Sequence, residues 1–158
     1  MDLTFNIITL ARDARSYNDA YKVLRETTGK LSATQSNMDL STPALVCLAF
    51  SIELHIKLLL RTYDIIATGH DIGKLMKKLP KDELAYISMH SYFHPTQQGQ
   101  RFFENIATAS DLFIRTRYYF ENMGTLHFNT GFCNTLAKVI RERIVERVPY
   151  LSSDLGFS

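Results

Sequence analysis

The first part of the chain has the hydrophobic spacing of an amphipathic α-helix. Apolar side chains recur there every three or four residues, which places them on one face of a helix. These residues are Ile7, Leu10, Ala14, Tyr17, Tyr21 and Leu24. The pattern predicts an outer helix over residues 4–26, and Gly29 with the polar run at 32–39 predicts where this helix ends.

The next segment is apolar on nearly every face, which is typical of a helix that is buried on several sides. The predicted helix runs to about residue 63. Ser41 or Thr42 is its expected N-cap, with Pro43 at the first helical position, because Pro suits a position whose backbone N–H has no partner.

Three polar residues, Glu53, His55 and Lys57, interrupt the apolar stretch at 44–60. Charged side chains near the centre of a membrane span are costly. The stretch therefore predicts the buried central helix of a soluble bundle, and we expect no membrane association.

A joint at residues 67–69 follows the central helix. Asp71 is then placed to cap a short helix over 72–79, and Pro80 ends it, because proline cannot donate a helical hydrogen bond.

The remaining chain predicts three further helices and one loop. Two acidic residues open a short helix over about 82–89, and a polar loop follows at 90–100. Hydrophobic spacing then predicts a long helix over 100–122, stopped by Gly124, and a last helix over 130–147. We expect an all-α, up-and-down bundle of about four long helices and two short ones.

Composition supports this fold class and limits the functions. The chain has 158 residues, which predicts a single domain over residues 1–158. It has only 7 Gly and 4 Pro, few for the turns of a β-sandwich or barrel. Lys and Arg number 18 against 16 Asp and Glu, so we expect no broad nucleic-acid-binding surface.

The compartment is predicted from the cysteines and the N-terminus. Cys47 and Cys133 lie in apolar stretches, where a free thiol behaves as a small hydrophobic group. The N-terminus has no basic segment of the kind that begins a signal peptide. Both observations favour a reducing cytoplasm.

Glu53 and Lys57 are the first candidate site residues, because an unpaired charge on a buried helix is costly. Their four-residue spacing allows an intrahelical ion pair. Alternatively, Glu53 reaches across the bundle to Arg115 or Arg117 on the long helix at 100–122.

The run at 111–121 supplies the rest of this candidate cleft, with Arg115, Arg117, Tyr118 and Glu121. Arginine beside tyrosine suits a phosphate, a stacked base or a carboxylate. The same residues are equally suited to ordinary ion pairs at four-residue spacing, such as Arg117 with Glu121.

His90 and His94 are also four residues apart, a spacing that allows two ligands on one metal ion in a helix. Pro95 follows directly and no third ligand is near. We therefore expect neither a metal site nor a cofactor.

In order and spacing, three of these segments resemble the HEPN superfamily, small helical domains named for higher eukaryotes and prokaryotes nucleotide-binding. Glu53 and Lys57 match its recurring E-x-x-x-K, the segment at 69–80 looks like its G-H-D-L-x-x-L helix start, and the segment at 111–121 is similar to its aromatic-Arg-Tyr-x-Tyr-Glu stretch. The resemblance implies a helical bundle, frequent homodimers, and roles in RNA cleavage, toxin–antitoxin pairs, antiviral defence or nucleotide binding.

One feature of the family's ribonucleases is missing. They carry Arg, four to six residues and then His, whereas nine residues separate Arg117 from His127, and eleven separate Arg115 from it. Because this motif is missing, we expect a member of the family that has no catalytic residues. We expect it to bind a nucleotide, RNA or a protein partner from the same operon, in a bacterial stress, toxin–antitoxin or defence context.

Two alternatives stay open. One is a structural or assembly module in which the ion pairs only fix helix register. The other is a phosphohydrolase of the HD family, which the HDIGK segment resembles. It would use His70 and Asp71 as metal ligands, with Lys74 near a phosphate. The other histidine motifs of that family are missing.

Overall fold

The computed structural model describes residues 3–34, 40–110 and 129–157, and these are helical with no strand. The prediction of an all-α fold is therefore confirmed for the described residues. Their α-helices are α1 (Leu3–Ala33), α2 (Ser41–Arg61), α3 (Ile72–Met76), α4 (Lys81–Ser88), α5 (Gln100–Ala109) and α7 (Thr130–Arg147). Two short 3-10 helices, η1 (Pro95–Gln97) and η2 (Pro149–Leu151), complete the described structure.

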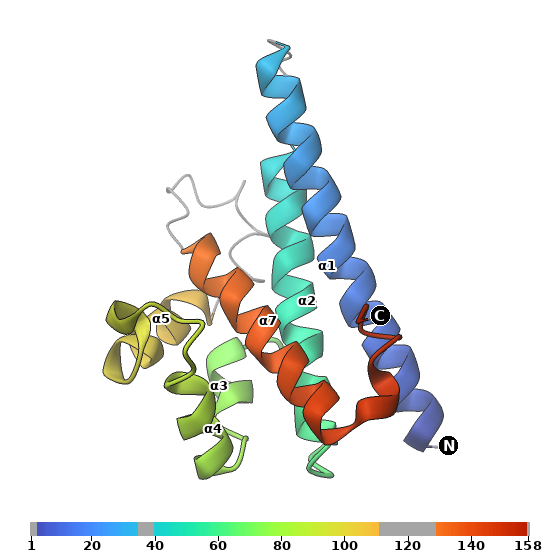
Figure 1. Cartoon of the computed structure of the whole chain (residues 1–158), viewed down its shortest axis with the longest axis vertical. Helices are drawn as coiled ribbons and strands as arrows, with labels where there is room; N and C mark the ends of the chain where they lie inside the picture. Colours follow the sequence, from blue (N-terminus) through green and yellow to red (C-terminus); the bar gives the residue numbers. More distant parts are fainter. Residues whose placement is uncertain (1–2, 35–39, 111–128, 158) are drawn as a thin grey trace.

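Helix α2 is the centre of the molecule. It packs against α1 on one side and against α7 on another. In Figure 1, α3 and α4 lie to the left of the lower half of α7, and α5 lies to the left of its upper half. By length and composition α2 is apolar enough to cross a membrane, but 61% of its most apolar stretch is buried inside the protein. Burial by neighbouring helices thus accounts for its apolar sequence.

The chain beyond α7 returns to the first helix. After η2, the last described residues lie against α1, where Arg12 Nε is 2.8 Å from Asp154 Oδ1 and Arg15 donates to the Ser153 carbonyl at 3.0 Å. Helix α1 is therefore held by α2 and, toward its start, by the C-terminal segment.

Two predicted boundaries of the long helices are wrong. Helix α1 does not stop at residue 26 but continues through Gly29 to Ala33, because one glycine costs only about 1 kcal/mol in a helix. Helix α2 has Leu40, and neither Ser41 nor Thr42, at its N-cap. Pro43 is accommodated at the third position because the first N–H groups of a helix lack intrahelical partners.

The later boundaries are a mixture of confirmed and wrong predictions. Asp71 caps α3 by accepting from the Lys74 N–H at 2.9 Å, as predicted, although α3 ends at Met76 and not at residue 79. Helix α7 has the predicted bounds. Helix α5 ends at Ala109 with Ser110 as its C-cap, so the predicted continuous helix over 100–122 is wrong, and residues 111–122 of it lie outside the described residues.

An aromatic cluster attaches the α3–α5 region to α7. The rings of Phe93, Phe102 and Phe132 come from the loop after α4, from α5 and from α7, with centroids 5.2–5.5 Å apart. All three side chains are fully buried. Such ring pairs add to the burial energy of the individual side chains.

Candidate functional site

The predicted pair on α2 is present, and it has a third member. Glu53 is only 2% exposed, and Lys57 Nζ lies 2.6 Å from its Oε1. His70 Nδ1, from the joint before α3, is 3.1 Å from both carboxylate oxygens. The two partners compensate the buried charge of Glu53 from its own helix and from the neighbouring segment.

The other half of the predicted cleft is Arg115, Arg117, Tyr118 and Glu121, and these four residues lie outside the described residues. Whether Glu53 also meets an arginine therefore stays a prediction.

The residues of the HD alternative have local partners. Asp71 is the N-cap of α3, Lys74 Nζ is 3.8 Å from its Oδ2, and His70 contacts Glu53. Across residues 3–34, 40–110 and 129–157, no three His, Cys, Asp or Glu side chains gather where they could hold a metal ion.

His90 and His94 do not share a helix face. Neither residue lies in a helix, and each ring is used locally: His90 Nδ1 accepts from the Tyr92 N–H at 3.2 Å, and His94 Nδ1 is 2.8 Å from Thr96 Oγ1. The spacing of four residues therefore does not place the two rings one helical turn apart, which the two-ligand geometry would require.

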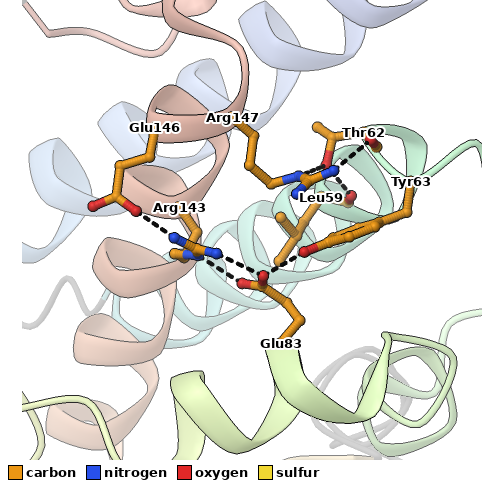
Figure 2. Close-up of polar contacts among 7 residues, drawn as sticks. All are labelled: Leu59, Thr62, Tyr63, Glu83, Arg143, Glu146 and Arg147. Atoms are coloured by element: carbon orange, nitrogen blue, oxygen red, sulfur yellow. Dashed lines mark hydrogen bonds and ion pairs between the residues drawn. The ribbon is translucent and has the colours of Figure 1, made fainter.

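Glu83 is the centre of a polar cluster that the sequence did not predict, shown in Figure 2. This α4 carboxylate is 3% exposed and accepts two 2.8 Å hydrogen bonds from the Arg143 guanidinium of α7. Tyr63 also donates to it. Arg147 donates to Thr62 and lies 3.6 Å over the Tyr63 ring.

The protonation states of this cluster follow from its hydrogen bonds. Burial acts to raise the pKa of Glu83, but the bonds from Arg143 and Tyr63 outweigh it and hold the pKa below its usual value. Burial and the bond to Glu83 raise the pKa of Tyr63. The carboxylate oxygens are used by internal partners, so the cluster acts as a structural joint between α2, α4 and α7.

A different group of polar residues surrounds a pocket of about 200 Å³ between α1, α2 and α7. We call it the His55 pocket. Its lining comprises Asn18 and Lys22 of α1, His55 of α2, and Asn134, Ala137, Lys138 and Arg141 of α7. It holds three cationic side chains and no carboxylate.

The hydrogen bonds of His55 define its tautomer. The ring is 1% exposed, and its Nδ1 lies 2.7 Å from the Ser51 carbonyl oxygen, which can only accept. Ser51 Oγ in turn donates to the Ala14 carbonyl at 3.0 Å. The ring hydrogen therefore sits on Nδ1, which leaves Nε2 as an acceptor.

Within the described ranges, two buried side-chain nitrogens have no hydrogen-bond partner: His55 Nε2 and Arg141 Nε. Both residues line the His55 pocket. One is an acceptor and the other a donor. Buried polar atoms are nearly always paired in native proteins, with protein groups or with ordered water, so these two nitrogens are exceptions among the described residues.

The pocket is electropositive. Among the described residues, no carboxylate forms an ion pair with Lys22, Lys138 or Arg141. Burial, reinforced by the positive charge of Arg141 and opposed by the Ser51 carbonyl, lowers the pKa of His55 to about 4. The imidazole is therefore neutral at pH 7, and the net charge of the lining is positive.

Sequence reasoning missed this pocket. His55 was visible only as a polar interruption of an apolar helix, and Lys138 and Arg141 as two cations three residues apart on α7. Nothing in the spacing of Lys22, over a hundred residues earlier, connects it to them. A buried histidine on an apolar helix was the one signal available.

The chain was compared with protein families, curated proteins and solved structures. None of them matches it. The HEPN resemblance therefore rests on the sequence motifs alone, and the residues of the described pockets carry the functional argument.

Proposed function

We propose that this protein is a non-catalytic helical domain that binds a phosphate-bearing ligand, a nucleotide or an RNA end, in the His55 pocket. The observation that carries the proposal is the lining of this pocket, in which Lys22, Lys138 and Arg141 come together with no carboxylate.

The charge of the pocket selects an anion. Arg141, Lys22 and Lys138 supply positive charge from two helices, and the lining contains no acid to neutralise it. Guanidinium and ammonium groups form strong, charge-assisted hydrogen bonds to phosphate oxygens. The volume of about 200 Å³ is several times the ~30 Å³ that one water molecule occupies in the liquid.

An aromatic surface at the edge of the pocket favours a nucleotide over a bare anion. Lys138, which lines the pocket, places Nζ 3.9 Å from the centre of the Tyr92 ring. Tyr92 is 46% exposed and meets His90 edge-on. Exposed aromatic rings next to cations are the surfaces on which bases stack.

The lining is poorly suited to catalysis. It offers no Ser, Thr, Cys or carboxylate as a nucleophile. His55, with a pKa of about 4, is a weak general base at neutral pH. These features support a binding role.

The family and setting are part of the same proposal. HEPN-like membership is supported by the order of the sequence motifs and is compatible with the Glu53–Lys57 pair on buried α2 and with Asp71 at the start of α3. A cytoplasmic homodimer in a bacterial toxin–antitoxin or defence system, and a second cleft around Glu53 and Arg117, stay predictions.

Isothermal titration with adenosine monophosphate, inorganic phosphate and a short 5′-phosphorylated RNA tests the proposal. We expect at least one of them to bind, and Arg141→Gln to weaken that binding at least about tenfold, because a charge-assisted bond contributes about 1.5–3 kcal/mol. Arg101→Gln is the matched control, since Arg101 is an exposed arginine that pairs with Glu104 on α5.

The control variant should bind as the wild type does. If no probe binds the wild type, the phosphate-binding proposal is wrong and the assembly module becomes the better interpretation. Equal losses in both arginine variants would show a general charge effect in place of a site.

A further inference from the structure

A second pocket lies between α3, α4 and α5, and it shares no lining residue with the His55 pocket. We call it the α3–α5 pocket. Its volume is about 340 Å³. Pockets of this size with a mainly apolar lining are typical of sites for small ligands. The apolar part of the lining comprises Met76 of α3, Leu84 of α4, and Phe102, Phe103, Ile106 and Ala107 of α5.

The walls of the α3–α5 pocket are held in place by contacts with their surroundings. The Ile72 N–H donates to the Ser110 carbonyl at 3.3 Å, which joins the start of α3 to the end of α5. Gly73 permits this close approach, because a Cβ there would lie only 3.2 Å from Ser110 Cβ. The bonds between Glu83 and Arg143 attach α4 to α7. A ligand in the pocket would break none of these contacts.

The lining of the α3–α5 pocket has an excess of positive charge. Lys74 and Lys77 are both exposed and lie three residues apart, whereas Asp71 is the one carboxylate in the lining. Asp71 caps α3, and its Oδ2 is 3.8 Å from Lys74 Nζ. In the part of the chain that the structure describes, no carboxylate forms an ion pair with Lys77. Two positive charges and one negative charge leave a single positive charge in excess.

The apolar and the charged parts of the lining differ in depth. Phe102 and Ile106 are buried at the floor, whereas the two lysines are exposed. Lysine side chains of this kind line a wall with their aliphatic stems and keep the ammonium group in water. Phe103 is 41% exposed and contacts the Phe102 ring edge-on at 5.4 Å, so it extends the apolar surface outward. A ligand that matches this arrangement has an apolar end and a charged end.

We propose that the α3–α5 pocket binds a small anionic amphiphile, namely an aliphatic chain that ends in one carboxylate. The chain packs on the buried floor, and the carboxylate lies among the lysines, where its single charge matches the single excess charge of the lining. The pocket holds roughly ten times the ~30 Å³ that one water molecule occupies in the liquid. A fatty acid of about eight carbons, which has ten non-hydrogen atoms, therefore fills it.

The first experiment varies the chain length of the fatty acid. The wild-type protein is titrated with butanoate, hexanoate, octanoate, decanoate and dodecanoate below their micelle concentrations, and the amide resonances of Gly73, Lys77 and Ala107 are followed by nuclear magnetic resonance. Burial of one CH₂ contributes about 0.8 kcal/mol, so affinity should rise about fourfold per carbon up to octanoate and then level off.

Two results of this series would overturn the proposal. One is the absence of saturable octanoate binding at these resonances. The other is an affinity that keeps rising through dodecanoate, because a pocket of fixed volume stops gaining contacts once it is full. Inorganic phosphate should not displace octanoate, since the two pockets share no residue.

The second experiment varies the head group on a constant chain. We expect octanoate to bind about fivefold more tightly than octan-1-ol, and octylamine to bind less tightly than either. The factor of five corresponds to about 1 kcal/mol for a charge contact near the surface. Equal affinities for all three compounds would contradict the selection of an anion.

Two neighbouring lysines give a matched pair of variants. Lys77→Gln should reduce the preference for octanoate over octan-1-ol toward one, because Lys77 lines the pocket. Lys78→Gln removes the same charge from an exposed residue outside the lining and should keep the preference. A similar loss in both variants would indicate a general effect of charge and would overturn the proposed role of Lys77.

A third variant tests whether the pocket itself is occupied. Ala107 is an exposed residue of the wall on α5, and Ala107→Leu fills space there with another good helix former. We expect octanoate to bind at least about tenfold less tightly to this variant, and unchanged binding would refute the location. Self-association of the wild type that Ala107→Leu abolishes, without octanoate binding, would assign the pocket to a second copy of the chain and overturn the proposal.

Discussion

At the scale of single residues, His55 is the most informative side chain, because its burial lowers the pKa of the imidazole and thereby makes stability depend on pH. Burial favours the neutral imidazole over the charged imidazolium, and the positive charge of Arg141 adds a smaller effect in the same direction, so the pKa of His55 falls to about 4. The unfolded chain has no such restriction, and there a histidine titrates near 6.5.

This difference predicts a pH dependence of stability. Above pH 6.5 His55 is neutral in both states and contributes no slope. Between pH 6.5 and about 4 the unfolded state binds a proton that the native state does not. The free energy of unfolding therefore decreases as the pH is lowered through this range, by at most about 1.4 kcal/mol per pH unit. Below pH 4 both states are protonated and the contribution is constant.

Urea unfolding between pH 7.5 and 4 measures this slope in the wild type, in His55→Gln and in His94→Gln. The buried-site variant should show a shallower fall, and the variant at exposed His94 should keep the wild-type slope. Parallel curves for all three proteins would mean that His55 titrates normally in the native state.

At the scale of elements, hydrophobic periodicity predicted which helices exist better than where they end. The apolar stretch of α2 and the stripe of α7 are long, so burial energy decides them. The ends depend on single residues. Gly29 predicts a stop, but one glycine costs little inside a 31-residue helix, and α1 continues past it. Helix α5 ends at Ala109, and no glycine or proline follows it directly that would have predicted this end from the sequence.

The cap of α3 predicts a graded set of variants. Asp71→Ala removes the acceptor for the Lys74 N–H and should lower the free energy of unfolding by about 1 kcal/mol. Asp71→Asn keeps an equally good cap and should stay close to the wild type. Urea unfolding at pH 7 compares the three proteins.

If the asparagine variant is as destabilised as the alanine variant, the charge of Asp71 and its contact with Lys74 matter more than the cap. Wild-type stability in the asparagine variant would support the role of Asp71 as the N-cap of α3.

At the scale of the whole molecule, polar clusters join helices that periodicity treats as independent. Glu83 was predicted only as an acidic residue at a helix start, and its partners Tyr63 and Arg143 lie 20 and 60 residues away. The His55 pocket is equally non-local. Such sites could not be predicted from one sequence, because nothing in local spacing says which faces of α1, α4 and α7 meet.

The Glu83 cluster predicts a large effect from a small change. Glu83→Gln keeps the size of the side chain but leaves the Arg143 guanidinium without its carboxylate, so we expect the free energy of unfolding to fall by about 3 kcal/mol. Glu104→Gln removes the exposed pair with Arg101 and should cost less than about 1 kcal/mol. Chemical denaturation at pH 7 measures both, and similar losses would refute a special role for the buried cluster.

The placement of the His55 pocket also links occupancy to protein lifetime. Its lining comes from three helices and runs from Asn18 to Arg141, so the unfolded chain contains no equivalent site. A ligand present at one hundred times its dissociation constant would add about 2.7 kcal/mol to the native state. That shift corresponds to roughly a hundredfold fewer unfolded molecules exposed to proteases, and cellular phosphate or nucleotide levels would then set how long the protein persists.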